Sequence, residues 1–540
     1  ILASVCAAKL GDVKQAISTA ETAVTYAEDE WQGTSVPSAR QAAGFEALLL
    51  YRHILALDVK LPERERVAAA FAAMEKARGR AYIDAAVRGG ANLWSTSVEV
   101  PPLLARDKKE IEAHVADLDK QIFAGKDDAT QIERRRDALW ALDDVKAAIA
   151  YRNPLITRLS MPRPATLDRA RDLLDDKSML VAFLMTNDQA VAIAVTKTDA
   201  RLYVIEGGPS ALAAQVGVLR DEAIGDPHAS MELVHTKAHE LYVKLLAPVD
   251  DLVKTHERLI VLPHGALSTL PLEALVDNNG QFLVENHVVT YSQSATLALE
   301  DMRAKAKSPK RELVALGDPV YDWASFKAGK PEGLPAAAAR GMKRYSDAKS
   351  RGTRRGLERL PGTAAEVKAI AAMFGRDAKL YMRDEASEEN VKSGILGNSR
   401  IIHIASHGLF ETDYQALALS MRPDAKDDGF LLQSEIAELK LDAELVVLSA
   451  CETGRANEVL AEPVSGFVLA LRTAGARRML ASLWPVDDTA TMELMKAFYA
   501  PIVKSGATYA SALTDAKRKL VATDKWKHPF FWAPFVLVGN

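Results

Sequence analysis

The chain has 540 residues, of which 48% are apolar and 26% charged, and its formal net charge is -4. This composition is typical of globular proteins and excludes a disordered or fibrous chain. A chain of this length is too long for one hydrophobic core and predicts two to four domains. The small negative charge provides no basic field for nucleic acid, and no run of 18 apolar residues predicts a membrane span.

Two cysteines, Cys6 and Cys451, are too few for a disulfide framework or a cysteine-rich zinc module. Cys6 lies in an apolar helical pattern, and we expect it to be a buried, inert thiol. Because the chain starts at Ile1 inside a helical pattern, we expect it to be part of a longer polypeptide, with any signal peptide outside this sequence.

Residues 1–90 are predicted to be helical. After a break at Gly11, apolar residues recur at helical spacing from Val13 to Val24. A second helix is expected over 41–57 and a third after Pro62. Alanine-rich helices joined by short turns resemble degenerate tetratricopeptide repeats, with an irregular helical bundle as the alternative.

Residues 91–155 predict an antiparallel helical hairpin. Apolar seams run from Ile111 to Ile122 and from Ile132 to Ile149 at heptad-like spacing. Gly125 and the charged residues after it form the predicted turn. We interpret the charge runs on these helices as a solvated face.

From about residue 155 the pattern changes to short apolar runs that alternate with amphipathic helices. This order predicts an α/β fold with two parallel-sheet units and helices on both faces. The units are expected over 156–310 and 360–540, with a strand and a basic insertion over 311–359 between them. The predicted strands are Met179–Met185, Ala190–Val195, Arg201–Ile205, Leu259–Pro263, Leu313–Leu316, Arg400–Ala405, Leu445–Ser449, Met479–Leu483 and Phe535–Val538.

The segment from Phe326 to Arg359 is rich in Gly, Ala, Lys and Arg and lacks apolar periodicity. This pattern predicts an exposed, flexible insertion. RNA binding is the alternative, but only Phe326 and Tyr345 offer stacking surfaces, so we expect no nucleic-acid partner. Its basic residues include Arg340, Lys343, Arg344, Lys349, Arg351, Arg354, Arg355 and Arg359.

Two predicted strands in the last third of the chain end in reactive residues. One runs into His407 and Gly408, and the other runs through Ser449 into Cys451. Neighbouring parallel strands bring their carboxyl ends within a few ångströms, and a thiol needs a nearby imidazole to become a thiolate. Singly, each residue would more simply be a core cysteine or a loop histidine. Together they predict a Cys–His dyad.

His403 lies four residues before His407 on the same predicted strand, which separates the two by about 13 Å. That distance excludes a shared metal ion, so we predict no metal site. We expect His403 to be a buried, hydrogen-bonded residue that supports the dyad.

The segments from His403 to Gly408 and from Leu448 to Gly454 resemble the paired signatures of the CHAT domain. CHAT domains are caspase-like cysteine protease domains that occur with tetratricopeptide repeats and are related to separase. The resemblance covers roughly 155–540, and the helices upstream fit the usual layout of the family. Further similar segments are Leu262–Gly265 with Leu270–Leu275, Leu360–Glu366, Ser482–Thr491 and Pro534–Gly539.

The resemblance implies that residues 360–540 form the catalytic half of a cysteine endopeptidase that needs no cofactor. Cys451 would attack the scissile carbonyl, and His407 would act as general base and acid. The backbone amides of Gly408 and Cys451 would bind the oxyanion. Caspases carry Gln two residues before the cysteine, where this chain has Ser449, and lack the Glu-Thr after it. These departures argue against cleavage after Asp.

Residues 156–310 resemble the inactive half of separase-like enzymes. They carry His264 and Gly265 at a predicted strand end, but no cysteine lies between Cys6 and Cys451. This half would therefore pack against the catalytic half and position it.

Asp487 and Asp488 follow the strand after the cysteine strand, where separase-like proteases place an acid that pairs with an arginine before the cut. A pocket of this kind, beside Ser449, would select Arg over Lys through bidentate hydrogen bonds. The alternative is that the two aspartates cap the next helix. With an arginine pocket, the basic insertion between Arg340 and Arg359 would offer sites for self-cleavage, and an uncleaved linker is the alternative.

The resemblance implies a bacterial cytoplasmic enzyme that cleaves a protein substrate. A regulatory protein or ligand would bind at the helical repeats, and the enzyme would take part in stress, defence or cell-death responses. Two alternatives stay open. One is a catalytically inactive, repeat-based scaffold, and the other is acyl transfer by the same dyad to a non-protein substrate.

Overall fold

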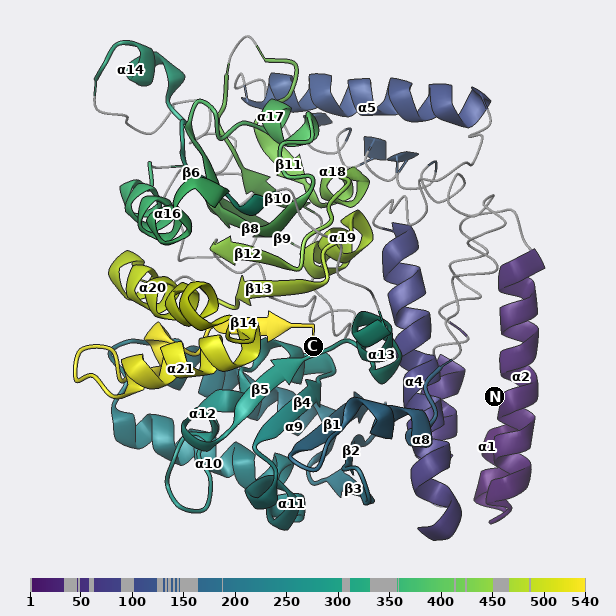
Figure 1. Cartoon of the computed structure of the whole chain (residues 1–540). Helices are drawn as coiled ribbons and strands as arrows, with labels where there is room; N and C mark the ends of the chain where they lie inside the picture. Colours follow the sequence, from purple (N-terminus) through teal and green to yellow (C-terminus); the bar gives the residue numbers. More distant parts are fainter. Residues whose placement is uncertain are drawn as a thin grey trace.

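The computed structural model describes residues 2–33, 46, 49–57, 63–88, 102–123, single positions between 130 and 145, 164–186, 188–303, 311–330, 357, 359–411, 414–422, 425–449, 466–484 and 487–539. Within these residues a layer of N-terminal helices stands beside a large α/β domain (Figure 1). No helix of the described residues combines the length and apolarity needed to cross a membrane.

The N-terminal helices confirm the helical prediction. Helices α1 (Leu2–Lys9) and α2 (Val13–Gly33) meet at a turn where Gly11 adopts a φ of 86°. This left-handed conformation favours glycine and explains the break. The predicted stripe on α2 is buried through Ala16 and Ala20, and α4 (Glu63–Arg88) buries Phe71.

The expectation of a buried Cys6 is wrong. Cys6 is exposed on α1. The helix buries Ser4 instead, whose hydroxyl donates a hydrogen bond of 2.6 Å to the carbonyl oxygen of Ala16. Residues two apart lie about 200° around a helix from each other, so burial of Ser4 turns Cys6 outward.

Helix α5 (Pro102–Phe123) is the first helix of the predicted hairpin. Its Val115 and Leu118 are buried and share a cluster with Ala138 of the second helix. Lys108 pairs with Glu438 at 2.6 Å and so ties α5 to the α/β domain. The turn at Gly125 and most of the second helix lie outside the described residues.

The two predicted units share one eleven-stranded sheet, which corrects the expectation of two separate sheets. Its order is β3-β2-β1-β4-β5-β14-β13-β12-β8-β6-β7. All nine predicted strands are present, whereas β5 and β7 were not predicted. The strands are β1 (Ser178–Met185), β2 (Ala190–Val195), β3 (Ala200–Ile205), β4 (Arg258–Leu262), β5 (Val288–Tyr291), β6 (Arg311–Pro319), β7 (Ala378–Arg383), β8 (Ser399–Ala405), β12 (Leu445–Ser449), β13 (Arg478–Ser482) and β14 (Phe535–Val538).

The two halves of the sheet run in opposite directions. Strands β1, β4 and β5 are parallel to one another and to β14, which comes from the second half of the chain but runs in the direction of the first. Strands β7, β6, β8, β12 and β13 are parallel to one another, and β13 pairs antiparallel with β14. Strands β2 and β3 add an antiparallel edge. The carboxyl ends of the two halves therefore lie at opposite edges of the sheet.

Helices cover both faces of the sheet, as predicted. One face carries a single cluster that spans both halves. It is covered by α9 (Gly208–Gly217), α10 (Met231–Leu245), α11 (Asp250–Thr255), α12 (Leu283–Asn286), α16 (Pro361–Phe374), α20 (Asp488–Ser505) and α21 (Tyr509–Val521). The other face is covered by α4, α8 (Leu167–Ala170) and α13 (Ala295–Arg303) over the first half, and by α17 (Glu388–Lys392), α18 (Gln433–Glu438) and α19 (Gly466–Ala474) over the second.

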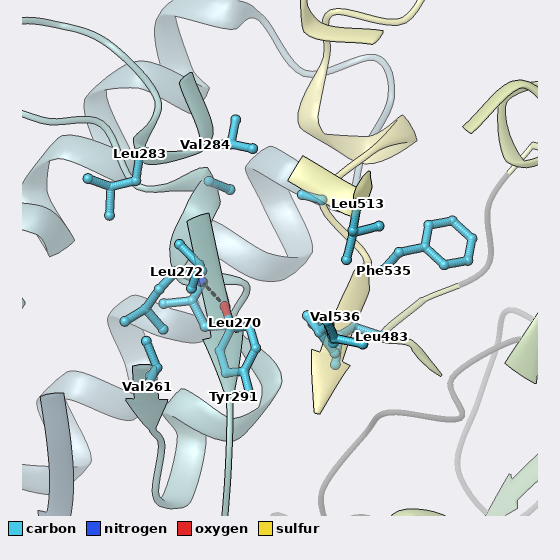
Figure 2. Packing of buried hydrophobic residues seen from close by; sticks show 14 of the residues in the cluster. Val261, Leu270, Leu272, Leu283, Val284, Tyr291, Leu483, Leu513, Phe535 and Val536 are labelled. Atoms are coloured by element: carbon cyan, nitrogen blue, oxygen red, sulfur yellow. Dashed lines mark hydrogen bonds between the residues drawn. The ribbon is translucent and has the colours of Figure 1, made fainter. Parts of the chain in front are cut away.

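The junction of the halves is apolar around a buried ion pair. Figure 2 shows Leu272 and Tyr291 of the first half in one cluster with Val536 of the second, and the Leu272 N–H donates to the Tyr291 hydroxyl at 2.8 Å. Lys517 on α21 pairs with Glu273, which also accepts from Tyr291. Burial lowers the pKa of Lys517. This polar group joins the two halves.

Helix α4 is tied to the first half by two buried charged side chains. The Arg78 guanidinium donates to the carbonyl oxygens of Leu262 (2.8 Å), Gln293 (2.9 Å) and Pro263 (3.0 Å), and also to that of Phe183. Burial lowers the pKa of Arg78 to about 10. Glu75 accepts from the backbone N–H groups of residues 295 and 296, at the start of α13. These contacts occupy the carboxyl ends of β1 and β4.

A second sheet of three strands was not predicted. It consists of β9 (His407–Glu411), β10 (Tyr414–Ala418) and β11 (Phe430–Leu432), in the order β11-β10-β9. Strand β9 begins directly after β8, with only Ser406 between them. The chain therefore leaves the main sheet at the position of His407.

The described flanks of the basic insertion contact β6 and β7. On the N-terminal side lies α14 (Trp323–Lys327), and on the C-terminal side Leu357 is buried. Arg359 makes a two-pronged hydrogen bond to Asp318, at 2.9 and 2.8 Å. Arg359 is therefore part of the fold rather than of a solvated linker. Residues 331–356 lie outside the described residues.

Candidate active site

Strands β8 and β12 are paired in parallel, with Ala405 opposite Ser449. These two residues end their strands, and neighbouring strands lie about 4.8 Å apart. His407 follows Ala405 by two residues, and Cys451 follows Ser449 by two. Cys451 itself lies outside the described residues. The structure therefore gives the pairing of β12, which ends two residues before Cys451, and not the position of the thiol.

His407 is the first residue of β9 and is paired with Ala418 of β10. Its backbone N–H donates to the Tyr321 hydroxyl at 3.4 Å. The two rings lie with centroids 5.3 Å apart and planes inclined by 48°. Gly408, the predicted oxyanion residue, comes next in β9 opposite Leu417. The imidazole is therefore held at the carboxyl edge of the second half.

His403 lies in β8 with no exposed surface and faces the helices α16 and α20. Its Nε2 lies 3.1 Å from Oε1 of Glu366, and its Nδ1 lies 3.1 Å from the hydroxyl of Tyr499. Burial raises the pKa of Tyr499 well above its ordinary value. This polar group lies inside the core behind the strand that leads to His407.

Asp487 caps helix α20. Its Oδ1 accepts from the backbone N–H groups of Thr489 and Ala490, both at 3.0 Å. An aspartate at this position satisfies amides that the helix itself leaves without partners. Of the two pocket candidates, Asp487 therefore has the alternative role of a helix cap.

Asp488 lies against the first turn of α16. A Cβ atom added to Gly362 would overlap the Asp488 side chain, so a larger residue there would force Asp488 to shift. Although the residue is exposed, the surrounding protein removes part of the water around its carboxylate, and this loss of hydration raises the pKa of Asp488. The charges of Asp487 and Glu366 also raise this pKa, whereas the charge of His407 lowers it. Within the described residues, no lysine or arginine pairs with Asp488.

His264 lies at the opposite edge of the sheet from His407. It is buried, its Nδ1 accepts from the backbone N–H of Met185 at 3.2 Å, and Arg52 lies 3.5 Å from its Nε2. Burial and the charges of Arg52 and Arg78 lower its pKa well below the ordinary value. The first-half histidine thus lies near Arg52 and Arg78 of the N-terminal helices, at the opposite edge from the candidate dyad.

Two site residues were not predicted. Tyr321 follows β6 and contacts His407, although nothing in the local pattern around it indicates this role. Gly362 lies within the Leu360–Glu366 segment, so its presence in a family-like motif was a usable signal. The reason for a glycine at this position is the close approach of Asp488, which could be seen only in the folded chain.

Comparison with known proteins assigns a family to the second half and to much of the first. Residues 235–540 match the family model described as the CHAT domain. The chain belongs to the CHAT domain family. The matched CHAT segment begins within α10 and contains β4 to β14, and with them His264, His407 and Cys451. Strands β1 to β3 precede it.

The curated relatives are tetratricopeptide repeat proteins. The chain is 24% identical over 344 residues to human tetratricopeptide repeat protein 28. The match covers 56% of this chain and 13% of the human protein. To the mouse protein the chain is 30% identical over 376 residues, and the match covers 61% of this chain and 14% of the mouse protein. The chain therefore spans about one seventh of the length of these CHAT-related proteins.

Two solved structures resemble the fold of this CHAT chain. One is separase in the Saccharomyces cerevisiae separase–securin complex, with a TM-score of 0.40, 9% identity, and 98% of this chain and 40% of that chain covered. The other is the Arg-specific cysteine proteinase gingipain R, with a TM-score of 0.34 and 10% identity. That match covers 58% of this chain and 68% of the gingipain chain. Similarity at this level concerns the fold and not the chemistry.

Proposed function

We propose that this chain is a cysteine endopeptidase in which Cys451 is the nucleophile and His407 the general base and acid. The observation that carries the proposal is the register of β8 and β12, which pairs Ala405 with Ser449. Each lies two residues before a member of the proposed dyad. The membership of the chain in the CHAT family supports the same function.

The reaction follows from the chemistry of the two groups. His407 accepts the proton of the Cys451 thiol, and the thiolate attacks the scissile carbonyl. The backbone N–H groups of Gly408 and Cys451 donate to the oxyanion that forms. His407 then protonates the leaving amine, and water hydrolyses the thioester. His403, buried beneath this edge, stabilises the strand that ends before His407.

An arginine before the cut is the proposed substrate side chain. Asp488 offers a carboxylate that no lysine or arginine of the described residues neutralises, close enough to His407 for their charges to interact. A guanidinium can meet a carboxylate through two parallel hydrogen bonds, which favours Arg over Lys. Ser449, at the end of β12, would line the same pocket.

Regulation through the helical region is part of the proposal. Helix α4 is bonded to the first half through Arg78 and Glu75, and it also lies against α19. Helix α19 is the first described element after Cys451 along the chain. A protein or ligand bound to the N-terminal helices could therefore act on the catalytic half through α4.

The test of the proposed function is proteome-wide mapping of new chain termini. We expect the wild-type chain to generate termini that neither Cys451→Ala nor His407→Ala generates, with folding of the variants checked by circular dichroism. Because the dyad acts as one unit, the double variant should lose no more activity than either single one. Activity above a few per cent in Cys451→Ala would contradict Cys451 as the nucleophile. A wild-type chain that generates no new termini would contradict the proposal and favour a repeat-based scaffold.

Thiol labelling gives a second readout that needs no substrate. A dyad thiolate should react with iodoacetamide faster than an ordinary thiol. Because Cys6 is exposed, it would also be labelled, so the measurement is made in a Cys6→Ser background. His407→Ala in that background should slow the labelling of Cys451.

A further inference from the structure

We propose that Tyr321 is a positioning residue for His407, and that the flanks of the basic insertion hold Tyr321 in place. The inference rests on the proposed function, because it concerns the same histidine. Tyr321 lies two residues after the end of β6, on the edge of the sheet where His407 begins β9. It contacts His407 in two independent ways.

The first contact is with the backbone and the second with the ring. The Tyr321 hydroxyl accepts from the His407 N–H at 3.4 Å and donates to the carbonyl oxygen of Ala418 at 3.2 Å. Ala418 is the partner of His407 in β10, so one hydroxyl spans both strands of this pair. The tyrosine ring lies 5.3 Å from the imidazole, centroid to centroid. Together these contacts restrict both the main chain and the side chain of His407.

Tyr321 is itself firmly held. It is 3% exposed and forms a small core with Leu357, Ala416, Ala418 and Phe430. Burial raises its pKa, so the hydroxyl remains protonated and able to donate. This core packs between the second sheet and the end of β6, and it is separate from the large clusters on the two faces of the main sheet.

The insertion meets Tyr321 through both of its flanks. Asp318, three residues before Tyr321, is buried and adopts a φ of 53°, a left-handed conformation that few non-glycine residues take. Its carboxylate accepts from Arg359 and, at 2.9 Å, from Arg383. The guanidinium of Arg383 also lies 5.0 Å from the ring of Phe326 on the other flank. Leu357 completes the link by packing in the core of Tyr321.

The arrangement makes His407 sensitive to events in the insertion. A partner or a cut that pulls on the returning flank would act first on Arg359 and Leu357, and then on the tyrosine that they help to hold. Displacement of a catalytic group by about 1 Å is enough to lower a rate about 10²-fold. Tyr321 is thus the residue through which the insertion would act on the dyad.

The kinetic test compares Tyr321→Phe and Tyr321→Ala with the wild-type chain on an arginine peptide. Tyr321→Phe keeps the ring and should retain kcat within a few fold, whereas Tyr321→Ala should lower kcat by about 10- to 100-fold with little change in KM. Tyr381→Phe on β7, whose ring lies near Lys379 instead, is the matched control and should have no effect. A kcat in Tyr321→Ala within twofold of wild type would overturn the proposal.

The second test does not depend on proteolysis. The ring signals of His407 are followed by NMR in histidine-labelled Cys451→Ala protein and assigned with His407→Gln. Tyr321→Ala should move these signals, and Tyr321→Phe should largely preserve them. Arg359→Gln should move them in the same direction as Tyr321→Ala but less. Unmoved signals in Tyr321→Ala would overturn the positioning role, and unmoved signals in Arg359→Gln would overturn the link to the insertion. A chain that cleaves no peptide would contradict the proposed function and leave these readings valid.

Discussion

Adjacent aspartates at the start of α20 illustrate how much one residue position matters. Asp487 directs its carboxylate to the backbone amides of its own helix, whereas Asp488 lies against Gly362 near His407. The first interaction stabilises the helix, and under the proposed function the second carboxylate meets the arginine of a substrate. The capping alternative therefore describes Asp487, and the pocket role stays a prediction for Asp488.

We predict that Asp488→Asn lowers kcat/KM for arginine peptides at least about tenfold, through loss of the charged partner. Because the pKa of Asp488 is raised above the ordinary 3.8, its carboxylate becomes protonated at a higher pH than a typical aspartate. As pH falls through that range, kcat/KM for arginine peptides should fall in the wild-type chain, and this component should be absent in Asp488→Asn.

The matched control is Asp487→Asn, because asparagine caps helices as well as aspartate does. It should leave specificity unchanged. A peptide library cut equally well after Leu, Asp or Gly would exclude an arginine pocket at Asp488.

The insertion between β6 and α16 shows how an element can join structure and regulation. Its C-terminal flank is bonded to Asp318, because Arg359, one of its predicted cleavage sites, has its guanidinium held by that buried carboxylate. A peptide must extend to enter a protease cleft, so a bound arginine is a poor site. The remaining basic residues lie between 340 and 355.

We predict self-cleavage between Arg340 and Arg355, and not after Arg359. A cut near residue 350 would divide the 58.7 kDa chain into fragments of about 38 and 21 kDa on a denaturing gel. Sequencing of the new terminus locates the cut, and Cys451→Ala should remain one band. An active preparation that stays full length while it cuts another protein would show that the insertion is a linker rather than a maturation site.

At the scale of the whole molecule, the two halves use opposite edges of one sheet. The second half presents His407 at its carboxyl edge, whereas the first half has its own carboxyl edge filled by Arg78 of α4. This explains why His264 takes no part in the candidate site. The first half thus serves as the attachment point of the N-terminal helices.

We predict that Arg78→Met lowers stability by roughly 2 to 4 kcal/mol, because buried carbonyl oxygens lose their donor. The thermal midpoint should fall, and limited proteolysis should release α4 earlier than in the wild-type chain. Lys76→Met, which removes an exposed cation from the same helix, is the control and should change neither. Equal sensitivity of both variants would contradict an anchoring role for Arg78.

Local pattern in the sequence was sufficient to predict the helices and most strands. Short apolar runs such as Leu445–Ser449 are strands because burial on both faces of a sheet requires continuous apolar residues. The same runs marked the strand ends that precede His407 and Cys451. Strand β7 was missed because it carries Lys379 and Arg383 at an edge of the sheet and therefore lacks a continuous apolar run. The strands of the second sheet were missed because they are too short to give such a run.

Only the tertiary structure decided which distant residues meet. Arg78 and Gln293 are 215 positions apart, and neither the antiparallel pairing of β13 with β14 nor the contact of Tyr321 with His407 leaves a periodic trace in the sequence. Periodicity reports whether a residue is buried, not which partner buries it, and in the short, largely apolar helix α1 it did not even distinguish Ser4 from Cys6. The sequence by itself therefore determined the elements and the reactive residues. The direction of the halves, the neighbours of His407 and the place of Asp488 depend on long-range packing, which only the folded chain defines.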